Sequence, residues 1–143
     1  MTFLPPLLNE FGSELTMLRG AIASCVTATA PSRQLDAVIA RAVFPALAAL
    51  EELEAGIWQQ EDSSRVRALN YSRTWTAAAT LVPPGCWIEH DCADVIVMGP
   101  HGGSRSAHDI LPIALCLAAL RARIQAAQWG MCVWGLSKET RND

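Results

Sequence analysis

The sequence predicts an α+β domain in which N-terminal helices precede a helix, β-hairpin and helix sandwich with a small antiparallel sheet. Three observations support this prediction: apolar residues recur at helical spacing in the first half, two short segments rich in Ile, Val and Trp follow, and an Ala- and Leu-rich stretch comes after them. The 143 residues suffice for one hydrophobic core, and 51% hydrophobic against 17% charged residues favours packed helices over disorder.

Helices are predicted through most of the first half. Residues 7–25 carry apolar side chains every three or four positions, and Ser32 is placed to cap a second helix by accepting a hydrogen bond from a main-chain N–H of its first turn. Pro45 cannot donate a main-chain hydrogen bond, so this helix should end or kink just before it. The apolar spacing then predicts that the helix resumes and runs to Ile57.

The polar stretch 59–67 is expected to be a linker. It divides the chain into a helical N-terminal region, residues 1–60, and a small α/β sandwich region, residues 61–143, which together should form one compact domain. Charge is divided in a similar way. Up to Asp62 the chain has eight acidic residues and three arginines, whereas from Ser63 onward it has eight basic and six acidic residues. Such polarity steers encounters with charged partners.

A helix and a hairpin are predicted next. Ser72 is a candidate cap for a short helix through Val82, which the following Pro-Pro-Gly stops. Segments 86–90 and 94–98 are rich in Trp, Ile and Val, and the polar residues between them favour a tight turn.

The last third is expected to hold a loop, a helix and a tail. The glycine-rich stretch 99–108 predicts a loop, and Asp109 is placed to cap a helix that tolerates Pro112 in its first turn. Apolar residues around most of this helix predict that it is largely covered. The segment 128–135, with two tryptophans, is expected to be an extra strand or a packed coil.

Three strings stand out along the chain: PSRQLDAVIARAV (31–43), YSRTWTAAATLVPPGCWI (71–88) and LPIALCLAALRARI (111–124). In this order and spacing they resemble small uncharacterised proteins encoded by phages and prophages of high-GC bacteria, sometimes called a phage α/β sandwich domain. The resemblance implies short strands between two helices and a protein that acts in the cytoplasm of a host cell. It transfers no catalytic residue.

Zinc-binding chemistry is available in one cluster: Cys86, His90, Cys92, His101 and His108. The spacing argues against a site, because the first two share one face of a strand, the third lies at the turn, and no Cys-x-x-Cys occurs. The five cysteines are odd in number and scattered, so we expect reduced thiols rather than disulfides. We predict no bound metal and no cofactor.

The stretch 99–109 also suggests an anion site or a hydrolase triad. Its glycines precede a helix start, which favours anions, but Asp109 at the cap would repel them. The candidates for a triad are all in one short loop, too close together to reach the required geometry: His101, Ser104, Ser106, His108 and Asp109. We predict no catalytic residue.

Tryptophans are frequent for a chain with one tyrosine. Trp75 and Trp87 are expected to pack between helix and sheet. Trp129 and Trp134 lie near the chain end among glycines, and tryptophan is enriched at binding hot spots. These two are therefore candidates for contact with a partner.

Glu51, Glu52 and Glu54 form an acidic run that is either the solvated face of a helix or part of a recognition surface. The preferred function is a non-enzymatic phage or prophage accessory protein that binds a host or phage protein, such as a host defence component of the CRISPR effector type. The alternative is a small enzyme or ligand-binding domain that uses residues 86–109 to bind a metal or an anion.

Other partners are less favoured. No stretch approaches the roughly 18 unbroken apolar residues of a membrane-spanning helix, and no basic region precedes an apolar one at Met1, so no membrane association is expected. The acidic total and scattered arginines argue against direct nucleic-acid binding. Homo-oligomer formation is left open.

Overall fold

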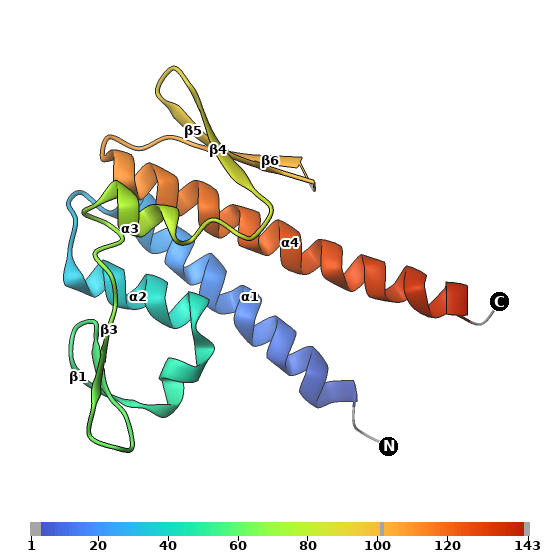
Figure 1. Ribbon diagram of the computed structural model, residues 1–143, viewed down its shortest axis with the longest axis horizontal. Helices are drawn as coiled ribbons and strands as arrows, with labels where there is room; N and C mark the ends of the chain where they lie inside the picture. Colours follow the sequence, from blue (N-terminus) through green and yellow to red (C-terminus); the bar gives the residue numbers. More distant parts are fainter. Residues whose placement is uncertain (1–3, 101, 142–143) are drawn as a thin grey trace.

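The computed structural model describes residues 4–100 and 102–141, with side chains described for residues 12, 14–100 and 102–129. Within these residues the chain forms four α-helices, one 3-10 helix and two three-stranded antiparallel sheets, which confirms the α+β class (Figure 1). In chain order the elements are α1 (Leu4–Thr27), α2 (Arg33–Val43), η1 (Pro45–Ala49), β1 (Glu51–Glu54), β2 (Ile57–Gln59), β3 (Arg65–Arg67), α3 (Trp75–Ala79), β4 (Trp87–Asp91), β5 (Asp94–Gly99), β6 (Gly102–Ser106) and α4 (Leu111–Arg141).

Helix α2 begins and ends where the sequence predicts. The Ser32 side chain accepts a hydrogen bond from the Leu35 N–H at 3.0 Å, and Phe44 follows the last helical residue. The predicted continuation to Ile57 is wrong. After Pro45 the chain makes only the short η1 and then a hairpin, in which Gly56 adopts a φ of 82° and reverses the chain direction.

The first sheet has the order β1-β2-β3. Trp58 pairs with Glu52 on one side and with Val66 on the other, and its side chain is only 1% exposed. The stretch 59–67 is therefore not a linker, because it contains the turn and the third strand of this sheet. Residue 60, where the sequence places a boundary between two regions, lies between β2 and β3.

The second sheet contains the predicted hairpin and one further strand. Strands β4 and β5 pair from Trp87↔Met98 to Asp91↔Asp94, as expected. The glycine-rich segment predicted to be a loop instead supplies β6, which pairs with β5 along its whole length. Its glycine and serine residues have little strand propensity, so pairing with β5 stabilises this strand more than its own sequence does.

Helix α3 is shorter than predicted, and its cap is Thr74 rather than Ser72. The Ala77 N–H donates to the Thr74 hydroxyl at 3.3 Å. At the start of α4, the Ile110 N–H donates to Nδ1 of His108 at 2.9 Å, and Pro112 occupies the first turn as expected. The chain remains helical through 128–135, so the predicted strand or coil there is wrong.

Helix α4 is the centre of the fold. All residues from 113 to 120 are at most 2% exposed, which confirms that this part of the helix is covered on all sides. It contacts α1, α3, β5 and β6, and α1 in turn contacts α2. Helices α1 and α4 extend past both sheets towards the two chain ends (Figure 1).

Candidate functional site

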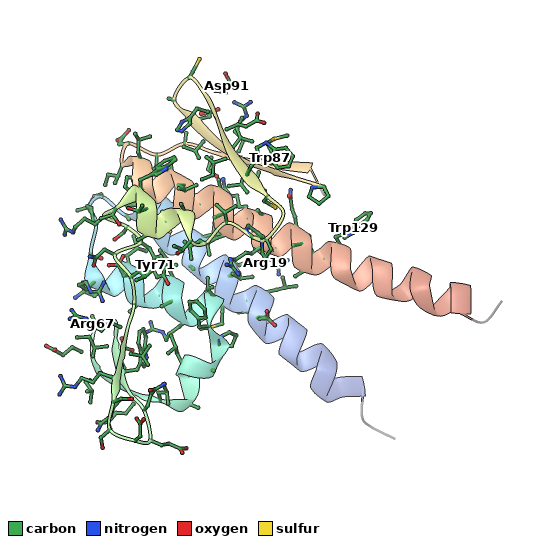
Figure 2. All side chains as sticks on the ribbon, viewed as in Figure 1. Arg19, Arg67, Tyr71, Trp87, Asp91 and Trp129 are labelled. Carbon is green, nitrogen blue, oxygen red and sulfur yellow. The ribbon has the colours of Figure 1, made fainter. Side chains whose placement is uncertain are left out.

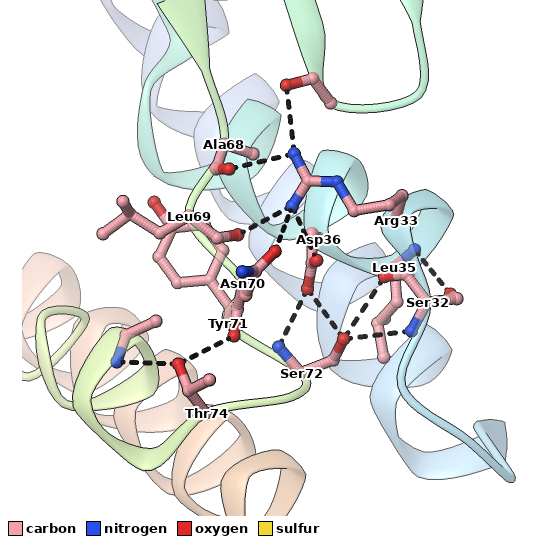
Figure 3. Close-up of polar contacts among 12 residues, drawn as sticks. Ser32, Arg33, Leu35, Asp36, Ala68, Leu69, Asn70, Tyr71, Ser72 and Thr74 are labelled. Atoms are coloured by element: carbon pink, nitrogen blue, oxygen red, sulfur yellow. Dashed lines mark hydrogen bonds and ion pairs between the residues drawn. The ribbon is translucent and has the colours of Figure 1, made fainter.

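An ion pair within α2, between half-buried Arg33 and buried Asp36, is hydrogen-bonded to the chain that follows β3 (Figure 3). Asp36 is 2% exposed and accepts hydrogen bonds from the Ser72 N–H at 2.8 Å, the Ser72 hydroxyl at 2.7 Å and Arg33 at 2.9 Å. Arg33 also donates to the Gly56, Ala68 and Leu69 carbonyls and to the Asn70 side chain. Both charges are satisfied by the fold, so this cluster positions the chain and leaves little capacity for catalysis.

An apolar groove, which we name the Phe44 groove, lies beside this cluster. It encloses about 530 Å³ between the end of α2, η1, the first sheet and the segment after β3, and its apolar wall includes Phe44, Leu47, Leu50, Trp58, Val66 and Leu69. Phe44 and Leu69 stand at 54% and 47% exposure although both are large and apolar. Large apolar side chains exposed at the edge of an apolar groove are typical of binding sites rather than of ordinary surface.

Two polar side chains of the Phe44 groove lack a partner among the described residues. Tyr71 is 3% exposed, burial raises the pKa of its hydroxyl, and that hydroxyl makes no hydrogen bond within the described part of the chain. Arg67 also lines the groove, is exposed, and forms no ion pair with any residue the structure describes. Figure 2 labels both side chains.

A second surface is the outward side of the β4-β5-β6 sheet, which we name the Trp87 face. Val95 and Val97 point into the core, so the alternate residues Ile96 and Met98 point outward. In register beside Met98 stands Trp87, which is 51% exposed (Figure 2). The prediction that Trp87 packs between helix and sheet is wrong, because strand register turns its neighbour Ile88 towards the core instead.

Local contacts fix the shape of the Trp87 face. The Trp87 indole N–H donates to Glu89 at 2.8 Å, which holds the ring against its own strand. Gly103 lies opposite Met98, and a Cβ at position 103 would come within 2.8 Å of the Met98 sulfur. At the rim, Arg105 pairs with Asp94 at 2.7 Å and with Asp91 at 2.9 Å, and these hydrogen bonds raise its pKa. The result is a small apolar patch in which Met98 lies beside Trp87, while Ile96 lies in register between Glu89 and Arg105.

Polar groups of the expected anion loop are used within the fold. Ser104 donates to Gln125 at 3.1 Å, and Ser106 accepts from Arg121 at 2.7 Å. His108 lies 3.0 Å from the Ala28 carbonyl through Nε2, while its other nitrogen accepts the Ile110 N–H. These side chains are thus separated by the contacts that hold β6 and the start of α4, and they do not form a triad.

The possible zinc ligands are also dispersed. His90 stacks on Trp75 with ring centroids 5.3 Å apart, which confirms that Trp75 packs between helix and sheet. Cys92 is exposed at the hairpin turn, Cys86 is half-buried, and His101 lies outside the described residues. Among the described residues no group of three or more His, Cys, Asp or Glu side chains could hold a metal ion.

The predicted partner-binding residues lie on separate elements. The acidic run belongs to β1 rather than to a helix, and Glu52 is engaged within the fold because it accepts from Arg41 at 2.7 Å and from the Gly56 N–H at 3.1 Å. Glu51 and Glu54 are exposed. Trp129 is 51% exposed on α4, and the Trp134 side chain lies outside the described residues.

Comparison with protein-family models, with curated proteins and with solved structures finds no match for this chain. In the part of the chain that the structure describes, no helix combines the length and apolar character needed to cross a membrane.

Proposed function

We propose that this chain is a non-enzymatic binding protein that docks on another protein through the Trp87 face. The observation that carries the proposal is the exposed Trp87 indole, which stands beside outward-facing Ile96 and Met98. Tryptophan is the side chain most enriched among residues that dominate binding energy, and such residues sit in an apolar centre with a polar rim.

The form of the surface supports a protein partner. Small molecules bind in concave sites, whereas one face of a three-stranded sheet offers a broad and shallow surface. Arg105, Asp91 and Asp94 provide paired charges at the rim, where they affect encounter and orientation more than affinity. The resemblance to phage and prophage proteins suggests a partner in the bacterial host, such as a component of a defence system.

The test is capture of the partner by tagged protein from a bacterial host lysate, followed by binding kinetics with the purified partner. Trp87→Ala should raise Kd by about 30-fold or more, mainly through faster dissociation. Leu111→Ala is a matched control, because Leu111 is 52% exposed at the start of α4. It should bind like the parent.

Two further variants separate this face from the surfaces expected from the sequence. A Glu51→Lys and Glu54→Lys double variant and a Trp129→Ala variant should retain the slow dissociation of the parent. If Trp87→Ala binds as the parent does, or if only these other variants lose the partner, the Trp87 face is not the docking surface.

A further inference from the structure

We propose that the Phe44 groove binds a small amphipathic carboxylate, whose apolar body lies in the groove and whose carboxylate is received by Arg67 and Tyr71. This site is separate from the Trp87 face, because the groove is built on the first sheet and the Trp87 face on the second. The inference does not rest on the proposed function.

The size and lining of the groove fit an apolar ligand body. Its volume of about 530 Å³ falls within the roughly 300 to 1,000 Å³ of sites for small molecules. Trp58 and Leu47 are buried in the wall of the groove, whereas Phe44 and Leu69 remain exposed at its edge. An apolar body in the groove would remove both exposed side chains from water, which is favourable.

The charge in the groove selects an anion. Arg67 is the only charged side chain among the described residues that line the groove, and it forms no ion pair with a described residue. A guanidinium presents a planar fork of N–H donors that matches the two oxygens of a carboxylate. One such cation next to apolar walls suits a monocarboxylate better than a polyanion.

The buried hydroxyl supplies the second donor. Tyr71 lies four positions after Arg67 in the segment that leaves β3, with Leu69 between them, and all three line the groove. A hydroxyl that is buried without a hydrogen bond is costly to the ligand-free fold. Like any tyrosine hydroxyl, Tyr71 is a protonated donor at neutral pH, and burial raises its pKa further.

The test uses octanoate as the probe and 1-octanol as its neutral counterpart, with two-dimensional NMR of the full chain. Octanoate should shift the amide signals of Phe44, Leu47 and Leu69 in a saturable way, and 1-octanol should bind more weakly. Arg67→Gln and Tyr71→Phe should each weaken octanoate binding by about threefold to tenfold, as expected for a charge-assisted contact that solvent partly screens.

Three controls make the result decisive. Arg65→Gln, on the same strand but outside the groove lining, should bind octanoate like the parent, and so should Trp87→Ala. Ligand-free Tyr71→Phe should melt no lower than the parent, because it removes only a hydroxyl that has no hydrogen-bond partner among the described residues. Equal affinity for octanoate and 1-octanol, equal binding by the Arg65 and Arg67 variants, or no shift at the groove amides would overturn the proposal.

Discussion

Asp36 is a buried carboxylate that connects residues 36 positions apart in the chain. Its oxygens accept both donors of Ser72 and one from Arg33, and Arg33 in turn holds main-chain carbonyls at the β1–β2 turn and after β3. The first sheet and the wall of the Phe44 groove are thereby fixed against α2. An ion pair with one buried member adds little to overall stability by itself, but removal of Asp36 leaves the Arg33 charge uncompensated.

Asp36→Ala should lower the free energy of unfolding by about 2 to 3 kcal/mol, because it leaves the buried Ser72 N–H without its acceptor and Arg33 without its counter-charge. Urea unfolding followed by circular dichroism measures the change. Glu51→Ala, at an exposed position on β1, should alter stability by no more than about 0.5 kcal/mol. If Asp36→Ala lowers the free energy of unfolding by less than about 1 kcal/mol, water replaces the hydrogen bonds that Asp36 makes in this cluster.

At the scale of the elements, two turns contain a glycine with the same positive φ but different surroundings. Gly56, between β1 and β2, and Gly85, before β4, both have a φ of 82°. A Cβ at Gly56 would lie 2.7 Å from Nη2 of Arg33, whereas a Cβ at Gly85 would meet no atom within 4 Å. The pair therefore separates backbone strain from loss of the Arg33 contacts.

Gly85→Ala should cost about 1 kcal/mol through the left-handed backbone alone. Gly56→Ala should cost about 2 to 3 kcal/mol, since it also displaces the Arg33 guanidinium from its acceptors. Thermal unfolding of the two variants beside the parent gives both values. Equal losses would show that Arg33 moves aside without consequence for the fold.

Elements with a long, regular pattern could be predicted from the sequence, and short ones could not. Helices α1 and α2 and the β4–β5 hairpin follow directly from apolar spacing and capping residues. The strands β1, β2 and β3 have only three or four residues each, too few for alternation to show, and the acidic β1 fits helical spacing equally well. The Gly- and Ser-rich β6 depends on tertiary pairing.

The candidate site was predictable to a smaller extent. The importance of tryptophan could be predicted, but Trp87 and Ile88 are adjacent, and only strand register decides which of them faces the core. The Phe44 groove is lined by residues from three separate stretches of the chain, 40–50, 58–60 and 66–71, so no local pattern reveals it. A large apolar residue just before Pro45 was the one sequence signal, because a helix end places such a residue at the surface.

At the scale of the whole molecule, the contact between α1 and α4 brings two buried thiols to the centre. Cys25 and Cys116 are both 0% exposed, and the Cys116 thiol donates to the Tyr71 carbonyl at 3.3 Å. Burial raises the pKa of Cys25 from 9.0 to about 12, with Arg121 opposing the change. Burial raises the pKa of Cys116 as well, and the nearby Cys25 adds to the effect.

Because of these thiols, the free energy of unfolding should fall at alkaline pH. In the folded protein they stay protonated, whereas in the unfolded chain they ionise above their ordinary pKa of 9.0, so rising pH favours unfolding. Their stabilising effect is complete below about pH 9 and is lost as pH approaches 12. The buried Tyr71 hydroxyl, whose pKa is also raised, acts in the same direction.

We predict that the free energy of unfolding, measured by urea titration at a series of pH values, falls above about pH 9 by about 1.4 kcal/mol per pH unit for each buried thiol. Cys25→Ala should have a shallower slope, because one ionising group is lost from the unfolded chain. Cys92→Ala, at the exposed hairpin turn, should keep the parent slope. If Cys25→Ala retains the parent slope, the Cys25 thiol ionises in the folded state as it does in the unfolded chain. Water would then reach this thiol, and α1 and α4 would not pack closely enough to bury it.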